Sequence, residues 1–255
     1  MGPLIVIWMA LVLLGMSVAF TLGASALVQL WLDGTPMAVI AQRMTKSISD
    51  SFPLLAVPFF IFAGNLMNTG GITERVFSFA RVLVGHFRGG LAHVNVVASI
   101  IFSGMSGSAL ADAGGLGNME IKAMRDAGYD DGFAGAVTIS SSTIGPLIPP
   151  SIPMVIYGVL GDVSIGRMFI GGVVPGFLTA AALMVLIGYY SHKRSYPKDD
   201  KPTLKEVVTK FGRAIFPLFT PAIIIAGIAF GFFSPTEAAV GASLYAMFLS
   251  MVVYR

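Results

Sequence analysis

The sequence predicts an all-α polytopic membrane protein, and two observations indicate this class: its composition and the length of its apolar segments. Hydrophobic residues make up 55% of the 255 residues and charged residues only 11%, whereas a soluble domain carries roughly 25% charged residues. The mean hydropathy is +0.82. Uncharged segments long enough to cross the hydrocarbon of a bilayer recur along the chain. They are residues 3–31, 91–110 apart from His93, 168–190, 214–233 and, with its flanks, 238–253.

The first apolar segment, residues 3–31, is interpreted as a retained membrane helix. Ala24, Ser25 and Ala26 resemble a signal-peptidase site. However, no Lys or Arg precedes them, and the apolar run is longer than the core of a signal peptide. We therefore expect this segment to stay in the mature protein and to cross the membrane.

Two amphipathic segments and a shorter apolar one come next. The apolar segment, residues 51–67, could tilt, kink at Pro53 or Pro58, or cross only in part. On either side of it, apolar side chains recur at helical spacing. They form one stripe of Met37, Ile40, Ala41, Met44 and Ile48, and a second of Ile72, Val76, Phe79, Ala80, Leu83 and Phe87. This pattern fits helices in the membrane interface and connecting helices packed on neighbours about equally well.

Small polar residues and glycines interrupt the apolar sequence after residue 102. Ser103, Ser106 and Ser108 stand among glycines, and Asp112 follows them. Small residues in membrane helices serve close packing more often than ligand binding. An ionisable residue near membrane depth, in contrast, is a functional-site hypothesis by default. Asp112 is therefore a candidate site residue, with a helix cap or a position at the interface as the alternatives.

A helix-breaking run begins near Ser142 and places four prolines within eight residues, between apolar helical segments. Because proline lacks an N–H, Pro149 cannot pair with the carbonyl of Gly145, and Pro146 leaves the carbonyl of Ser142 without its helical partner. Lipid cannot satisfy such groups, so a broken helix at membrane depth indicates a binding site. Ser151 is expected to cap a new half-helix. The break thus predicts oxygen ligands for a cation and N-terminal donors for an anion.

Basic residues cluster between His192 and Arg213, where seven Lys or Arg face three acids. By the positive-inside rule, this loop is cytoplasmic. Thr203 and Glu206 within it have the spacing of a capping box. The apolar residues that follow on one helical face are Leu204, Val207, Val208 and Phe211. These features predict a short helix on the cytoplasmic surface of the membrane.

Six motifs together resemble the large membrane subunit, or permease, of the tripartite ATP-independent periplasmic (TRAP) transporters. They lie at residues 51–60, 70–75, 86–96, 106–112, 142–153 and 234–239, so the resemblance runs along the whole chain. It implies a sodium-driven secondary transporter that imports organic acids through the bacterial inner membrane. It also implies two protein partners, a periplasmic substrate-binding protein and a small membrane subunit, with no organic cofactor and no nucleic acid.

The resemblance further implies an elevator mechanism, in which a transport domain with a re-entrant hairpin and broken helices moves against a scaffold. Carried over by position, backbone oxygens of five residues would bind sodium: Ser106, Ser108, Gly145, Ile148 and Pro150. The proline pattern independently favours Gly145. Substrate would lie near Ser103, Asp112 and Thr143. No catalytic residue is expected, since the family is not one of enzymes.

The resemblance also divides the chain into four parts. These are residues 1–90 with scaffold helices and interfacial arm helices, 91–165 with the transport-domain hairpin and broken helix, 166–213 with a membrane helix and the basic cytoplasmic loop, and 214–255 with the start of a second inverted repeat. Because the family has two inverted halves and the second is truncated here, we expect a fragment that does not transport alone. Ser17 stands where proline is common in the family, a change expected to alter only local helix geometry.

Other functions remain open on the residues alone. A passive ion or anion channel could use the same carbonyls, and coupling to protons could replace coupling to sodium. An intramembrane enzyme is less favoured, because no His-Glu-x-x-His motif occurs, His86 and His93 lack zinc-pair spacing, and Asp112 has no second membrane aspartate. The absence of cysteine excludes thiolate chemistry. With so few charged residues, the formal net charge of +3 does not indicate nucleic-acid binding.

Overall fold

The structure, a computed structural model, describes residues 2–49 and 52–254. Within these two ranges every regular element is a helix, which confirms the all-α class. The chain divides into two units, residues 1–52 and residues 53–255.

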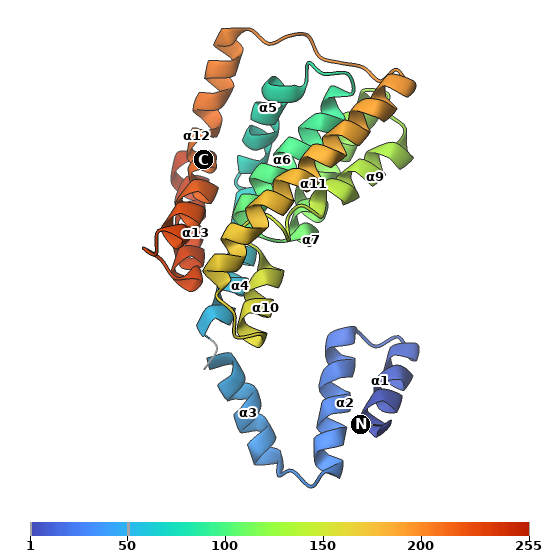
Figure 1. Ribbon diagram of the computed structural model, residues 1–255, viewed down its shortest axis with the longest axis vertical. Coiled ribbons are helices and arrows are strands. Elements are labelled where there is room, and N and C mark those ends of the chain that lie inside the picture. The colour runs from blue at the N-terminus through green and yellow to red at the C-terminus, as the bar shows by residue number, and fades with distance from the viewer. Residues whose placement is uncertain (1, 50–51, 255) are drawn as a thin grey trace. The chain divides into compact units, whose positions relative to one another are not determined.

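The first unit holds α1 (Gly2–Leu13), α2 (Val18–Leu32) and α3 (Met37–Ser49). The single helix predicted over residues 3–31 is wrong, because the chain turns between α1 and α2, where Gly15 has a φ of +81°. Glycine adopts this left-handed conformation at no steric cost. α1 and α2 pack side by side (Figure 1). With 12 residues, α1 spans only about 18 Å, which is less than the hydrocarbon core.

α3 is the helix that the first amphipathic stripe predicted. Met37 and Met44 are exposed on it, and Ile40 is buried. The side chain of Ile48 lies outside the part of the chain that the structure describes.

The second unit contains the remaining helices, joined mostly by short turns (Figure 1). Their order is η1 (Phe52–Leu55), α4 (Ala56–Thr69), α5 (Ile72–Val84), α6 (Gly90–Ser106), α7 (Ala109–Ala111), η2 (Asp112–Leu116), α8 (Gly117–Asp126), α9 (Asp131–Ser142), α10 (Ile152–Leu160), α11 (Ile165–Lys193), α12 (Leu204–Ala229), α13 (Pro235–Phe248) and η3 (Leu249–Val253). η1 is a 3₁₀ turn, and η2 and η3 are π-helical.

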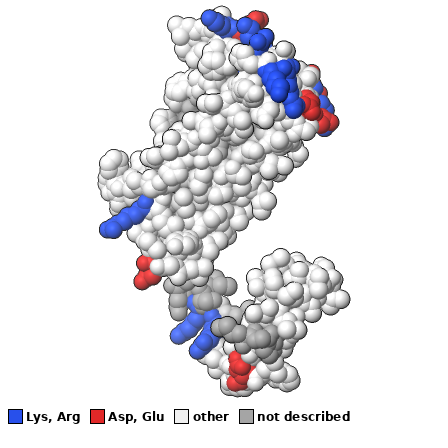
Figure 2. Space-filling model, turned by 45° about the vertical axis from the view of Figure 1, so that its right-hand side comes forward, with Lys and Arg blue, Asp and Glu red and all other residues white. Residues whose placement is uncertain are grey.

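Four helical stretches in the described residues are long and apolar enough to cross a membrane: Phe52–Thr69, Ile165–Lys193, Leu204–Ala229 and Pro235–Val253. They confirm membrane-length helices at three of the predicted spans. The short segment near Pro53, for which a partial crossing was left open, is also long enough to cross. The span predicted over residues 91–110 is shorter, because α6 ends at Ser106, before Gly107 with a φ of +63°. In Figure 2, wide flanks of the second unit carry no charge, and Lys and Arg gather at one of its ends.

The second amphipathic stripe was predicted either as a helix in the membrane interface or as a connecting helix packed on its neighbours, and α5 distinguishes the two. It packs against α6 and α12, and Ile72, Val76 and Ala80 have no exposed surface. The packed connecting helix is therefore the better description of this segment. The helix ends at Val84, so Phe87, predicted as the last member of the stripe, lies beyond it and is exposed.

The helix predicted as a short surface element after Thr203 is in fact the start of α12, which continues for 26 residues. The predicted capping box is present: the Glu206 carboxylate accepts from the Thr203 N–H at 2.8 Å, and the Thr203 hydroxyl accepts from the Glu206 N–H at 3.3 Å. Pro217 removes the N–H that would bond the Arg213 carbonyl. The Tyr254 hydroxyl donates to that carbonyl at 3.1 Å instead, and this bond helps the helix to continue through its prolines.

Candidate functional site

A helical hairpin forms the first half of the candidate site. α6 leads into it, and α7, η2 and α8 return along α6. The tip lies between Ser106 and Ala109. Gly107 turns the chain there in the left-handed conformation, and Ser108 caps the returning arm, since its hydroxyl accepts from the Ala111 N–H at 3.2 Å. Ser106 is fully buried, and the hairpin tip is thus part of the packed interior.

The break between α9 and α10 forms the second half. α9 ends at Ser142, and α10 begins at Ile152. The predicted free carbonyl of Ser142 is wrong, because the chain tightens into a turn in which the Gly145 N–H donates to it at 3.1 Å. Among the described residues, the carbonyls of Gly145, Ile148 and Pro150 accept no backbone hydrogen bond. Three of the five main-chain oxygens predicted to bind sodium are therefore free of backbone hydrogen bonds.

Ser151 closes the break as predicted. Its hydroxyl accepts from the Met154 N–H at 3.3 Å and donates to the Pro146 carbonyl at 2.6 Å. One buried side chain therefore caps α10 and also satisfies a carbonyl of the break. The result is a short half-helix whose N-terminus faces the same loop as the unpaired oxygens.

The hairpin tip and the break touch each other directly. The Ile152 N–H donates to the Gly107 carbonyl at 3.1 Å. A methyl group on Gly107 would lie 2.5 Å from the Pro150 carbonyl oxygen, and one on Gly145 would lie 3.3 Å from both the Ala109 nitrogen and the Ser103 hydroxyl. Gly107 is thus required for this close approach, and a side chain at Gly145 would force its neighbours to shift by a few tenths of an ångström. Two segments some 40 residues apart in the sequence form one locus, where the predicted ion ligands of both meet.

The residues predicted to surround substrate have different environments. Ser103 is fully buried beside Gly145, and its hydroxyl has no hydrogen-bond partner among the described residues. Asp112 is only 1% exposed. Ser99 and Ser142 lie close enough to interact with its carboxylate, but neither forms a hydrogen bond of normal geometry with it. Thr143 is exposed, and its hydroxyl donates to the Ser140 carbonyl at 2.6 Å.

A buried polar seam behind the tip joins Ser103 and Asp112, which were predicted as site residues, to six residues that were not. It runs between α6, the returning arm and α9, and all its members are at most 3% exposed. They are Asn95, Ser99 and Ser103 of α6, Asp112 and Glu120 of the returning arm, and Thr138, Ser141 and Ser142 of α9. The spacing of four along α6 is the signal that could have revealed its part of the seam.

Hydrogen bonds of the seam join the hairpin to the broken helix. The Asn95 side-chain amide donates to the Thr138 hydroxyl at 2.7 Å and accepts from the Ser141 hydroxyl. Glu120 interacts electrostatically with Asp112, because the π-helical turn η2 adds a residue and returns position 120 to the side of position 112. The hydrogen bonds of the seam thus hold α6 against α9, next to the place where the hairpin tip contacts the break.

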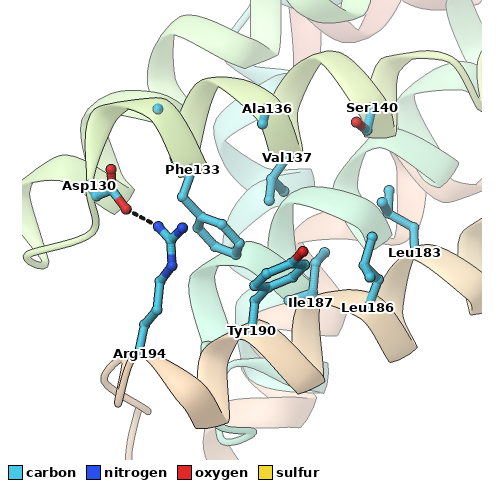
Figure 3. A pocket seen from close by; sticks show the side chains of 11 residues that line it. Asp130, Phe133, Ala136, Val137, Ser140, Leu183, Leu186, Ile187, Tyr190 and Arg194 are labelled. Carbon is cyan, nitrogen blue, oxygen red and sulfur yellow. Dashed lines mark hydrogen bonds and ion pairs between the residues drawn. The ribbon is translucent and has the colours of Figure 1, made fainter.

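A separate pocket of about 380 Å³ lies between α9 and α11. Figure 3 shows Leu183 and Leu186 along its apolar wall, with the Asp130–Arg194 ion pair at its rim. Next to the rim, Tyr129 stacks on Tyr196, and burial raises the pKa of Tyr129 to about 12. None of the predicted site residues lines this pocket. It is therefore distinct from the locus at the hairpin tip.

The donor set at the tip suits a hard cation. In the part of the chain that the structure describes, no group of three or more His, Cys, Asp or Glu could hold a metal. The unpaired groups at the tip include main-chain carbonyls and the Ser103 hydroxyl, which are hard oxygen ligands of the kind that alkali and alkaline-earth ions prefer. The residues present fit the sodium ion that the resemblance implies.

Comparison with known proteins identifies relatives over nearly the whole chain. The family model for the DctM component of tripartite ATP-independent periplasmic transporters matches residues 5–255. The large permease protein SiaM of a sialic acid TRAP transporter from Vibrio cholerae is 54% identical over 249 residues, which cover 97% of this chain and 58% of that protein.

Two further relatives match at similar length. The sialic acid TRAP transporter permease protein SiaT of Haemophilus influenzae is 49% identical over 253 residues, or 98% of this chain and 41% of that protein. The C4-dicarboxylate TRAP transporter large permease protein DctM of Vibrio cholerae is 39% identical over 253 residues, or 99% of this chain and 56% of that protein. The chain thus spans about half the length of these relatives.

Proposed function

Because the chain belongs to the DctM component family of the tripartite ATP-independent periplasmic transporters, we propose that it forms part of a sodium-coupled permease of the bacterial inner membrane. The permease imports an organic acid that a periplasmic substrate-binding protein delivers, and it works with a small membrane subunit. The two relatives named for sialic acid are 54% and 49% identical, whereas the one named for C4-dicarboxylates is 39% identical. These identities favour an acidic sugar of the sialic acid class.

The observation that carries this proposal is the contact between the hairpin tip and the break. Bound sodium would supply a positive charge for the backbone oxygens of Ser106, Ser108, Gly145, Ile148 and Pro150. Gly107 and Gly145 keep the two segments close enough to share ligands. The tip and the break are thereby held in one arrangement, and substrate binds beside it near Ser103, Asp112 and Thr143. Ion affinity and substrate affinity are then linked, because each favours the same arrangement.

We further propose how the chain is divided for transport. Residues 91–165 belong to the moving domain, and residues 1–90 supply scaffold and arm helices. Residues 166–213 contain a membrane helix and the cytoplasmic loop, and residues 214–255 begin the second inverted repeat. The Asn95 network supports this division, because it fastens α6 to α9 within the part assigned to the moving domain.

Uptake by the complete three-component transporter in proteoliposomes would test the proposed function. We expect labelled sialic acid to accumulate only when an inward sodium gradient and the binding protein are both present. The rate should saturate with substrate. Accumulation driven by a proton gradient without sodium would overturn the choice of ion. Substrate movement that never exceeds equilibrium under any gradient would indicate a channel instead.

A further inference from the structure

Three cationic side chains converge on a second open pocket, away from the hairpin tip. The pocket has a volume of about 420 Å³ and is lined by Arg75 of α5, Lys210 and Arg213 of α12, and by Glu74, Ser78 and Tyr254. Cations therefore outnumber carboxylates in the lining by three to one. Within the described residues the ion pairs are Arg81–Asp199, Arg125–Asp131 and Arg194–Asp130. None of the three pocket cations belongs to an ion pair.

The nearest other carboxylate on α12 is already engaged. Glu206 lies one turn before Lys210 and interacts with it electrostatically, but its carboxylate accepts from the Thr203 N–H and hydroxyl in the capping box. The positive charge of the pocket is thus left largely uncompensated by the described part of the chain.

Tyr254 gives the pocket a fixed wall between α5 and α12. The Arg75 guanidinium lies 3.9 Å from the centre of the Tyr254 ring and donates to the Gly71 carbonyl at 2.6 Å. The Tyr254 hydroxyl donates to the Arg213 carbonyl at 3.1 Å. Cation–π contact and two hydrogen bonds therefore hold Arg75 and Tyr254 in place before any ligand arrives.

The pocket lies where the membrane-length helices emerge from the apolar region. Arg213 directly precedes the uncharged residues 214–229 of α12. Tyr254 directly follows the membrane-length stretch Pro235–Val253. α12 also begins in the basic loop, which the positive-inside rule assigns to the cytoplasm. These positions place the pocket at the cytoplasmic interface between membrane and water, the level at which tyrosine and basic residues meet lipid headgroups.

We propose that this pocket binds the phosphate headgroup of an anionic phospholipid from the cytoplasmic leaflet. Basic pockets between membrane helices on the cytoplasmic side are suited to such headgroups. The planar guanidinium groups of Arg75 and Arg213 match the oxygens of a phosphate, and Lys210 adds a point charge. The inference does not depend on sodium coupling, so the two proposals can fail separately.

Native mass spectrometry of the delipidated protein in detergent tests the proposal. The protein is titrated with phosphatidylglycerol, with phosphatidylcholine and with inorganic phosphate. We expect phosphatidylglycerol to bind in preference to phosphatidylcholine. The double variant Lys210→Gln/Arg213→Gln should bind it about 30-fold more weakly, because each basic residue near the surface contributes a factor of about five.

Matched variants separate the pocket from general charge effects. Lys193→Gln/Lys201→Gln removes two cations near or in the basic loop that do not line the pocket, and it should change the affinity less than about threefold. Arg213→Lys keeps the charge but loses the planar guanidinium, so its affinity should lie between those of the unaltered protein and the double variant. Three results would each overturn the proposal: equal binding of the two lipids, equal loss in both double variants, or loss in Arg213→Lys as large as in the double variant. Inorganic phosphate that binds as tightly as phosphatidylglycerol would also overturn it, since the site would then recognise a free anion.

Discussion

Gly107→Ala measures how closely the hairpin tip and the break are packed. Gly107 has a φ of +63°, and an added methyl group would lie 2.5 Å from the Pro150 carbonyl oxygen. Gly128 offers a matched control, since its φ is +85° and a methyl group there would meet nothing within 4 Å. Both variants bear the cost of the left-handed conformation, about 1–2 kcal/mol. Only Gly107→Ala adds overpacking, which costs about 1–3 kcal/mol.

The two variants are compared by thermal unfolding in detergent. With about 2–4 °C lost per kcal/mol in a chain of this size, Gly128→Ala should lower Tm by about 2–8 °C and Gly107→Ala by a further 2–12 °C. A second readout is sodium-dependent stabilisation, which Gly107→Ala should weaken and Gly128→Ala should leave intact. Equal Tm and equal response to sodium in the two variants would refute the close contact on which the site depends.

Two more stability predictions concern hydrogen bonds that join helices. Asn95→Leu should destabilise the protein by about 1–3 kcal/mol in the same unfolding assay, because the Thr138 and Ser141 hydroxyls lose a buried partner. Ser99→Ala removes a hydroxyl without a hydrogen-bond partner and should therefore cost clearly less stability. An equal loss of stability in the two variants would argue against the Asn95 hydrogen-bond network. Tyr254→Phe should cost about 1 kcal/mol through the uncovered Arg213 carbonyl, and an unchanged Tm would show that α12 continues without this bond.

Local chemistry explains which parts of the fold could be predicted. The apolar segments near Phe169 and Ile224 and the capping box at Thr203 depend on residues close together in the sequence, and the structure confirms them. The break after Ser142 and the cap at Ser151 likewise follow from proline and serine chemistry.

The errors arise where local signals compete. Residues 3–31 read as one apolar run, yet the conformational freedom of Gly15 allows a turn that hydropathy cannot reveal. In α12 the opposite occurred: the segment after Thr203 was predicted as a short surface helix, but it continues as one helix to Ala229. Tyr254, far along the chain, donates to the Arg213 carbonyl that Pro217 leaves without its helical partner. The Ser142 carbonyl was predicted to be unpaired because Pro146 cannot donate to it. The chain instead forms a tighter turn, in which the Gly145 N–H, one residue earlier, donates to this carbonyl.

The candidate site was predicted only in part, for a related reason. Ser106, Gly145 and Pro150 were named as sodium ligands because of the resemblance to the family, and the proline pattern independently favoured Gly145 alone. Glu120 was missed because it lies in an amphipathic helix, where a charged residue is expected to face water. Its burial depends on the π-helical turn η2 and on packing against other helices, and neither has a local sequence signal.

Thermal unfolding in different salts tests most directly the claim that the tip and the break form one sodium site. The purified protein is heated in sodium, potassium or choline chloride at constant ionic strength. We predict a sodium-specific rise in stability that grows with concentration, reaching about 2.7 kcal/mol at a hundred times Kd. Gly145→Ala, whose added methyl group would lie 3.2–3.3 Å from its neighbours, should weaken the rise, and Gly135→Ala, at an open position of α9, should retain it. Identical unfolding curves in all three salts would contradict the account.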